Sequence, residues 1–240
     1  MYIRDLDEIK ITYVVKGTLI NQVPLSIGAG RNIPKVGIDN PIVRINEVPY
    51  IPGSSLKGVL RSEAERYVKT SLQSEFVCDI LRPDDRIGEL GRKKVLKEGY
   101  EPCIICRIFG GPTLASHLTV HNAIPCSPFR TETKASVSIN RITGAQYPGR
   151  LFNMEYIVPL TKFKFEARVD NIDLMGESLE AKVVNYLMDI LMKGQVWLGC
   201  RKSVGMGKVK LTGVEVLKIR FRDGQIVEED VTQSYLSRSV

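Results

Sequence analysis

Six segments of the chain show strand or helix patterns, and their order limits the folds that the chain can adopt. Four of them are rich in β-branched and alternating apolar residues, as strands are. The other two repeat apolar residues on one face at helical spacing. The order is strand, helix, strand, strand, helix, strand, at residues 8–20, 54–70, 118–125, 162–170, 177–193 and 208–221. This order predicts an α+β protein with a ferredoxin-like βαββαβ core. The polar tail beyond the last strand is expected to be frayed.

Two further segments interrupt the core as insertions. Residues 71–112 are dense in charge, Gly and Pro and have little periodicity, which is typical of a segment outside the main sheet. Residues 131–157 have polar arms rich in Thr and Ser and a tip near residues 143–149, which predicts an extended hairpin. Because the hairpin carries Lys134 and Arg141, we expect it to contact a partner chain or nucleic acid.

Length and charge bound the class of protein. The chain has 240 residues, a net charge of +7 and no apolar run long enough to span a membrane. Its N-terminal residues lack the apolar core of a secretory signal, so we expect a soluble, cytoplasmic protein with no membrane partner. The positive charge favours polyanionic partners, but the fold must gather the scattered cations onto one surface if they bind nucleic acid.

Residues 38–61 combine an acid with two cations. Asp39 lies in an Asp-Asn-Pro turn, and a short strand over residues 42–50 is expected to follow it. Lys57 and Arg61 are four residues apart, so they share one face of the next helix. This combination predicts a site that holds a phosphate chain with a carboxylate beside it.

The start of that helix is the expected anion site. Ser54 or Ser55 is a suitable N-cap, and free backbone N–H groups at a helix N-terminus favour an anion. The alternative is an ordinary capped amphipathic helix whose Lys57 and Arg61 are only solvated. The residues of this segment, taken alone, leave both interpretations open.

Two glycine-rich segments are further candidates for phosphate contact. Residues 21–37 form a long loop whose glycines let a backbone approach a ligand, although an ordinary surface loop has the same composition. In the second segment, glycines bracket two cations and a hydroxyl: Gly199, Arg201, Lys202, Ser203, Gly205 and Gly207. Such a loop can wrap a phosphate. It lacks the Lys-Ser/Thr pair of a nucleotide P-loop, and no helix follows it.

The five cysteines argue against a disulfide framework, because their number is odd and the chain has no apparent signal peptide. Cys103 and Cys106 form a C-x₂-C pair, which is half of a typical zinc site. Four residues could complete it: Cys78, Cys126, His117 and His121. A structural zinc and a reduced, partly buried thiol cluster both remain open.

Six motifs, in their order and spacing, resemble those of one family: LSIGAG, GIDNPIV, IPGSSLKGVLR, CRIFGG, TETKASVSINRITGAQ and LGCRKSVGMGKVKL. Over about residues 8–220 the chain is similar to the repeat-associated mysterious protein (RAMP) superfamily. Within it, the chain resembles the Csm-type, Cas-seven-like backbone subunits of type III CRISPR interference complexes. The resemblance implies one RAMP domain over residues 1–240, with a core like an RNA-recognition motif. It also implies a lid at residues 71–112 and a thumb hairpin at residues 130–157.

The resemblance implies an activity as well. Copies of such a subunit stack along a guide CRISPR RNA, and each thumb displaces a nucleotide of the guide–target duplex. Asp39 matches the acidic position beside which the target RNA is cut, so a guide-directed endoribonuclease that uses a divalent cation such as Mg²⁺ is implied. In that reaction the ribose 2′-OH attacks the adjacent phosphate, and Asp39 binds the cation or orients the nucleophile.

Position in the matching motifs, together with the charge of the hairpin and of the first glycine loop, marks the residues expected to contact RNA: Ser26, Arg31, Ser54, Ser55, Lys57, Arg61, Lys134, Arg141, Arg201, Lys202 and Ser203. Ser26 stands where members of the family often carry His, so its contact would be a weaker, neutral hydrogen bond. Some members hold zinc in the lid, and here Cys78, Cys103 and Cys106 are the candidate ligands.

The implied partners are guide RNA, target RNA, further copies of the chain and other subunits of the complex, including its large polymerase-like subunit. Two other functions stay open. One is a non-catalytic RNA-binding scaffold in the same complex, and the other is a guide-processing ribonuclease, which typically relies on His, Tyr or Lys without a metal. His117 and His121 belong to no motif that matches, and no acid or serine is spaced to form a relay with them.

Overall fold

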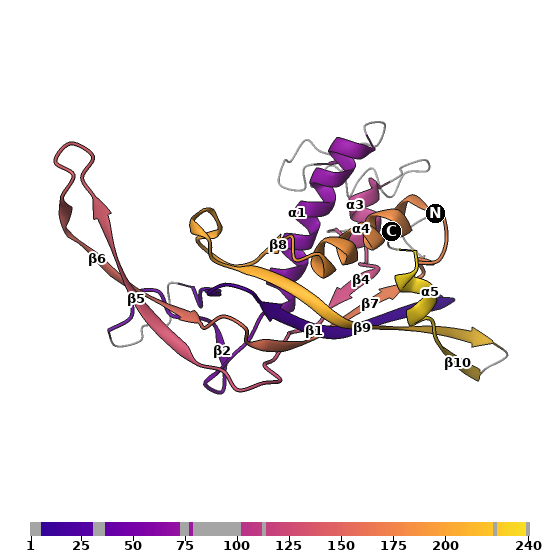
Figure 1. Ribbon diagram of the computed structural model, residues 1–240. Helices are drawn as coiled ribbons and strands as arrows, with labels where there is room; N and C mark the ends of the chain where they lie inside the picture. The colour runs from indigo at the N-terminus through magenta and orange to yellow at the C-terminus, as the bar shows by residue number, and fades with distance from the viewer. Residues whose placement is uncertain are drawn as a thin grey trace.

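The largest sheet is antiparallel, with strand β1 near its centre (Figure 1). The computed structural model describes residues 6–30, 37–72, 77–78, 102–111, 114–222 and 225–238. The strands follow one another in the order β10-β9-β1-β7-β4, and β8 pairs with β9. Their bounds are β1 Ile11–Asn21, β4 Leu118–Val120, β7 Lys162–Asp170, β8 Val196–Trp197, β9 Lys208–Arg222 and β10 Gln225–Asp230. The strands predicted at residues 8–20, 162–170 and 208–221 are therefore confirmed.

Alternation along the strands gives the sheet one apolar face. Val15 on β1 lies opposite Ala167 on β7 and Val216 on β9, and all three side chains are buried. Phe163 and Phe165 on β7 are also buried and continue this face. Because successive side chains of a strand point to opposite sides, the polar residues between them face away from the core.

Two long helices cover the apolar face (Figure 1). They are α1 (Gly53–Ser71) and α4 (Leu179–Met192), and each presents the apolar stripe that the sequence predicts. The rings of Tyr67 on α1 and Tyr186 on α4 stack with centroids 4.0 Å apart, which fixes the two helices together. The short helix α3 (Ile104–Phe109) packs against both.

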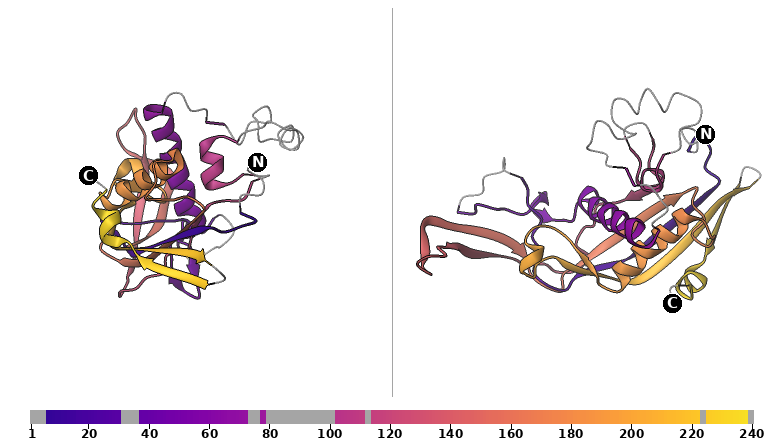
Figure 2. Two further views of the ribbon diagram at one scale, coloured as in Figure 1. Left: turned by 90° about the vertical axis from the view of Figure 1, so that its right-hand side faces the viewer. Right: turned by 90° about the horizontal axis from the view of Figure 1, so that it is seen from above.

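A separate two-stranded sheet extends from one end of the molecule, as the right-hand view of Figure 2 also shows. It consists of β5 (Thr131–Ile139) and β6 (Gln146–Ile157), which confirms the predicted hairpin. The outer part of β6 is exposed up to Leu151, whereas Met154, Glu155 and Ile157 are buried. We call residues 153–157 the hairpin root, because this part of β6 lies within the body of the protein.

Three local predictions are wrong. The segment 42–50 is not one strand but a small hairpin of β2 (Arg44–Ile45) and β3 (Val48–Pro49), whose turn residues Asn46 and Glu47 have positive φ. The strand predicted at 118–125 is only three residues long, as β4. The tail, expected to be frayed, forms β10 and the short helix α5 (Thr232–Leu236), because Tyr235 is buried and α5 packs on β9.

Most of the predicted lid at residues 71–112 lies outside the described residues, as does Arg31. No helix in the described ranges is long and apolar enough to cross a membrane.

Candidate functional site

A cavity of about 300 Å³ opens where segments distant in the sequence meet near the hairpin root. Its walls come from the first glycine-rich segment, the Asp39 turn, β6 and the second glycine-rich loop: Ser26, Gly28, Ala29, Gly30, Asp39, Asn40, Pro41, Met154, Cys200 and Arg201. We call it the Asp39 pocket. It brings Asp39 and Arg201, which the sequence places in separate motifs, to one site.

Asp39 is bound to the hairpin root by its main chain and by its carboxylate. The Asp39 and Asn40 N–H groups donate to the Asn153 carbonyl, each at 3.1 Å, and the Glu155 N–H donates to the Asn40 carbonyl at 3.1 Å. The Asn153 N–H donates to Asp39 Oδ2 at 2.7 Å. Among the residues that the structure describes, none donates to Oδ1. Asp39 is exposed, so this second oxygen can accept a ligand.

An ion pair between the half-buried Arg44 and the buried Glu155 lies next to these contacts. Both guanidinium nitrogens Nη1 and Nη2 of Arg44 donate to the Glu155 carboxylate at 2.7 Å, and Arg44 Nη2 also donates to Thr131 Oγ1 at 3.3 Å. Glu155 Oε2 accepts from the Ile42 N–H at 3.2 Å as well. The side chain of Glu155 is only 3% exposed. Hydrogen bonding to Glu155 raises the pKa of Arg44, so the pair is charged.

Ser26 has a structural position in the wall of the Asp39 pocket. Its side chain is buried, and its hydroxyl donates to the Glu155 carbonyl at 2.8 Å. Its own carbonyl accepts from the Cys200 N–H at 3.0 Å. Ser26 therefore joins the hairpin root to the second glycine-rich loop, and its hydroxyl is already engaged within the protein.

The second glycine-rich loop presents its polar residues to solvent. Arg201, Lys202 and Ser203 are all exposed, and Lys202–Val204 form a 3₁₀ turn. The Arg201 guanidinium lies over the ring of Phe152 on β6, 4.6 Å from its centroid. Gly207 has a φ of +93°, and a Cβ there would lie 1.9 Å from the Leu198 carbonyl oxygen, so only glycine permits this path.

The start of α1 differs from the prediction. Pro52, not Ser54 or Ser55, is the N-cap, and no side chain of the cap residue bonds the helix. The first N–H of the helix, that of Gly53, donates to Asn122 Oδ1, which lies outside the helix, at 2.8 Å. Ser54 lies exposed and Ser55 half-buried in the first turn, so both can still meet a ligand.

Lys57 and Arg61 are not simply solvated. Lys57 Nζ donates to Ser116 Oγ at 2.6 Å, and burial lowers the pKa of Lys57, with the charge of Arg61 adding to the effect. Arg61 donates to the Glu65 carboxylate at 3.1 Å and to the Gly110 carbonyl at 3.2 Å. Arg61 thus connects α1 to the end of α3.

Two hairpin cations stand apart from the Asp39 pocket, and a third lies opposite its wall. Arg141 near the tip is exposed, and Arg150 stacks on the Tyr147 ring with its guanidinium carbon 4.8 Å from the ring centroid. Lys134 on β5 is exposed and pairs with Met154, a residue of the pocket wall. A partner that contacted both the pocket and the hairpin tip would extend along the whole arm.

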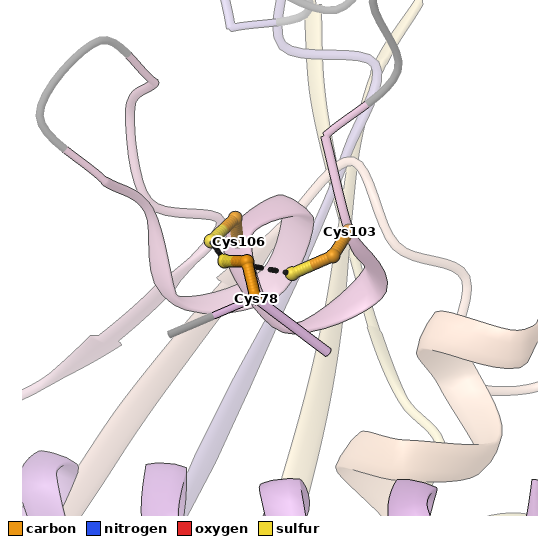
Figure 3. Close-up of side chains that lie close together, drawn as sticks. All are labelled: Cys78, Cys103 and Cys106. Atoms are coloured by element: carbon orange, nitrogen blue, oxygen red, sulfur yellow. Dashed lines mark hydrogen bonds between the residues drawn. The ribbon is translucent and has the colours of Figure 1, made fainter. Parts of the chain in front are cut away.

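Three cysteines meet beside α3, with their sulfur atoms directed toward one another (Figure 3). Cys78 Sγ lies 3.3 Å from Cys106 Sγ and 3.4 Å from Cys103 Sγ. Arg61 Nη2 lies 3.6 Å from Cys106 Sγ. Hydrogen bonds from Cys106 and Cys78 lower the pKa of Cys103, which favours a thiolate. This Cys₃ cluster could hold a metal ion, since thiolates are metal ligands.

The other suggested ligands lie elsewhere. Cys126 is exposed in the segment before β5, and His121 is exposed after β4. His117 is buried, with Nδ1 2.8 Å from the Asp170 carbonyl oxygen. Within the described ranges, the cluster therefore consists of Cys78, Cys103 and Cys106.

Sequence reasoning missed the contribution of Asn153, Glu155 and Arg44. Asn153 acts through its backbone, which no side-chain pattern can mark. Arg44 and Glu155 are 111 positions apart, and neither stands in a motif that pairs them. The only signal in the sequence was that Glu155 is the single charged residue between residues 151 and 157.

Three curated proteins are similar to the chain, and each bears the name CRISPR system Cms endoribonuclease Csm3. The protein from Methanothermobacter thermautotrophicus is 28% identical over 236 residues, covering 85% of this chain and 85% of the relative. That from Methanocaldococcus jannaschii is 28% identical over 219 residues, covering 85% and 80%. That from Mycobacterium tuberculosis is 28% identical over 154 residues, covering 63% and 61%.

A family model gives the broader relationship. The model described as the RAMP superfamily matches residues 24–210. This range includes the Asp39 turn, α1, the Cys₃ cluster, the hairpin and the second glycine-rich loop. Because the match spans well over half of the sequence, the chain belongs to the RAMP superfamily.

Proposed function

We propose that this chain is a guide-RNA-binding backbone subunit of a type III CRISPR effector complex and that it cleaves complementary target RNA. The single observation that carries the cleavage proposal is the Asp39 pocket. An exposed carboxylate is held there by one oxygen, with the other oxygen accessible and the exposed guanidinium of Arg201 in the same wall. The names of the similar proteins from both methanogens, which describe endoribonucleases, support the proposal.

The roles follow from charge. Arg201 holds a phosphate of the RNA strand in the pocket, because a guanidinium is suited to phosphate oxygens. Asp39 is placed to orient the ribose 2′-OH toward the adjacent phosphate or to bind a cation. Gly28 and Gly30 also line the pocket and present little bulk there, so a sugar-phosphate backbone can come close.

The residues present fit a divalent cation such as Mg²⁺. Mg²⁺ prefers oxygen ligands and is usually bound by one or two carboxylates together with substrate phosphates. Asp39 offers one such oxygen, and the RNA phosphates would supply the others. When bound, the cation neutralises the charge that develops on the phosphoryl oxygens.

The guide strand is assigned to the surface between α1 and the second glycine-rich loop. Ser54, Ser55, Lys57, Lys202 and Ser203 hold its backbone, which carries no sequence information, since base pairing supplies the specificity. Lys57 keeps two of its three N–H donors for this purpose. For Arg61, whose guanidinium bonds Glu65 and Gly110, we propose support of the α1–α3 contact. Ser26 acts likewise as a support of the pocket wall.

For the core and the hairpin we propose the forms expected of this family. The order β9-β1-β7-β4, antiparallel throughout and extended by β10 at one edge, supports a ferredoxin-like βαββαβ core. The β5–β6 hairpin serves as a thumb, with Lys134 and Arg141 along the RNA duplex. Further partners are the target RNA, copies of the chain along the guide, and other subunits of the complex, including the large polymerase-like one.

For the Cys₃ cluster we propose zinc. Zn²⁺ is commonly bound by thiolates in a tetrahedral arrangement, and three thiolates leave one position for a further ligand. Cys78, Cys103 and Cys106 would hold it and tie the segment around Cys78 to α3.

The proposed function is tested by Asp39→Asn in a complex assembled with guide RNA and target RNA. We expect cleavage to fall by about 10²–10⁴-fold while target binding is retained, because only the carboxylate charge is removed. Glu215→Gln, an exposed carboxylate on β9, is the matched control and leaves the rate unchanged. Cleavage by Asp39→Asn at the wild-type rate would remove Asp39 from catalysis. A wild-type complex that binds target but does not cleave it with Mg²⁺ would instead identify a scaffold subunit.

A further inference from the structure

The Asp39 turn and the hairpin root are connected at successive positions. Asp39 and Asn40 bond Asn153, and the Glu155 N–H bonds the Asn40 carbonyl. The Glu155 carboxylate then bonds the Ile42 N–H and both guanidinium nitrogens Nη1 and Nη2 of Arg44. The turn from residue 39 to residue 44 therefore follows β6 and cannot shift independently of it.

Arg44 contacts both strands of the hairpin. It donates to Glu155 on β6 at 2.7 Å and to Thr131 Oγ1 on β5 at 3.3 Å. Arg44 itself begins β2, which directly follows the Asp39 turn. The Arg44 guanidinium thus holds the two strands of the hairpin together at their base, and it belongs to the segment that directly follows the Asp39 turn.

Strand β6 links these contacts of Arg44 to the exposed arm, and its pairing with β5 is irregular only in the outer part, between Val137 and Ile139. The same strand runs from the exposed Gln146 at the tip to the buried Ile157. The right-hand view of Figure 2 shows the outer arm extending away from the described helices and from the large sheet. A force on the arm from a bound duplex is consequently transmitted along β6 to Asn153 and Glu155, where Asp39 is attached.

A contribution to stability does not by itself explain the Arg44–Glu155 ion pair. Replacing a buried ion pair by apolar residues of similar volume is often neutral or stabilising, because the charges lose hydration on burial. The bidentate geometry, by contrast, fixes direction as well as distance. Such a contact is suited to holding one segment in a defined orientation relative to another.

We infer that the Arg44–Glu155 ion pair is a positioning device that couples the placement of the β5–β6 hairpin to the orientation of the Asp39 carboxylate. Arg44 and Glu155 are positioning residues, since they act through Asp39 and need not touch RNA. Engagement of the hairpin by the guide–target duplex and cleavage at Asp39 thereby become linked. The inference rests on the proposed function and adds a means of control to the same site.

The experiment uses the complex assembled with guide RNA. Two variants break the pair in different ways: Arg44→Met with Glu155→Leu replaces it by apolar residues, and Arg44→Lys keeps the charge but loses the bidentate contact. The control is Arg107→Met with Glu180→Leu, a half-buried ion pair that joins α3 to α4. Single-turnover cleavage, target affinity, the Mg²⁺ concentration for half-maximal rate, and the unfolding temperature are measured for each.

We expect both pair variants to cleave about a hundred-fold more slowly, since small displacements of a catalytic group can cost this much. Target affinity should stay at the wild-type value, and more Mg²⁺ should be needed for the half-maximal rate. A wild-type rate in the pair variants overturns the inference. So does a parallel loss of rate and affinity at an unchanged Mg²⁺ dependence, which would mean a general effect on folding. If the apolar variant does not fold, the cleavage rate of Arg44→Lys alone decides whether the inference holds.

The coupling itself is tested by a double-mutant cycle with Arg141→Gln near the tip of the arm. The change at Arg141 should slow cleavage in the wild type and have little further effect once the Arg44–Glu155 pair is broken. Strictly additive effects would refute the coupling. Asp39→Asn distinguishes a failure of the proposed function from a failure of the coupling. If Asp39→Asn still cleaves, the proposed function fails. If it does not cleave and the pair variants do, only the coupling fails.

Discussion

Asn153 holds Asp39 by two reciprocal contacts across 114 positions of sequence. Its N–H donates to the Asp39 carboxylate at 2.7 Å, and its carbonyl accepts from the Asp39 N–H at 3.1 Å. Asp39 is therefore attached to the hairpin root and does not lie in a freely moving turn. This attachment leaves one carboxylate oxygen accessible in the Asp39 pocket.

Replacing Arg201 should weaken RNA binding through charge alone. For Arg201→Gln we expect lower affinity for single-stranded RNA at every sequence, because the guanidinium meets phosphate and not a base. The slope of log affinity against log salt should decrease in magnitude by about 0.7, the value for one phosphate contact on a single strand. Lys69→Gln, an exposed cation in the last turn of α1, is the control. Equal slopes in Arg201→Gln and the wild type would contradict the contact.

Substitutions at two glycines of the second glycine-rich loop distinguish the cost of a strained backbone from the cost of a steric clash. Gly205 and Gly207 both have positive φ, but a Cβ would meet nothing within 4 Å at Gly205 and the Leu198 carbonyl at Gly207. We expect Gly205→Ala to lower the free energy of unfolding by about 1 kcal/mol, the cost of the left-handed backbone. Gly207→Ala should cost clearly more. Chemical denaturation of both variants measures the difference, and equal losses would show that the loop can relax.

The Cys₃ cluster predicts metal-dependent stability. If zinc is bound, elemental analysis of the purified protein should find one zinc per chain, and a chelator should lower the unfolding temperature. Cys106→Ser should abolish both effects, whereas Cys126→Ser, an exposed cysteine outside the cluster, should leave both intact. An unfolding temperature that does not respond to the chelator, in protein without zinc, would favour a reduced thiol cluster.

The lowered pKa of Asp173 predicts that the stability of the fold depends on pH. Burial raises the pKa of Asp173, but hydrogen bonds from Tyr13 and the Met175 N–H and the charge of Lys218 outweigh it, so the pKa lies below 3.8. A lowered carboxylate pKa stabilises the fold above the unfolded value, and this stabilisation is lost as the pH falls through the folded value.

Asp173→Asn should accordingly be less stable than the wild type at pH 7, and the gap should narrow below pH 3.8. Denaturation curves at several pH values measure this gap. Glu215→Gln on the exposed face of β9 serves as a control for the loss of one carboxylate. A gap that stays constant from pH 7 to pH 3 would mean that the hydrogen-bonding geometry matters and the charge does not.

The helices and the longer strands were predictable because their signals are local. The apolar spacing of α1 and α4 and the alternation of β7 appear within single turns or residue pairs. The hairpin was equally visible, since its polar arms and tip are contiguous. The segment 42–50 was mistaken for one strand because nothing local marks the positive φ of Asn46 and Glu47.

The composition of the functional site was predictable only in part. Sequence motifs indicated Asp39, Arg201 and the cysteines as candidates. They did not indicate that Asp39 and Arg201 share a pocket, or that Lys57 donates to Ser116. The N-cap of α1 was misassigned because a residue from outside the helix, Asn122, bonds its first N–H.

The sequence by itself determined which elements form, in which order, and which residues have the chemistry to bind phosphate or metal, because these depend on near neighbours in the chain. Only the tertiary structure decided which of them meet. Asp39 reaches Asn153, Arg44 reaches Glu155, and Cys78 reaches Cys106 because the sheet brings distant backbone segments into hydrogen-bonding distance. Such contacts depend on the packing of the whole chain, so no local pattern records them.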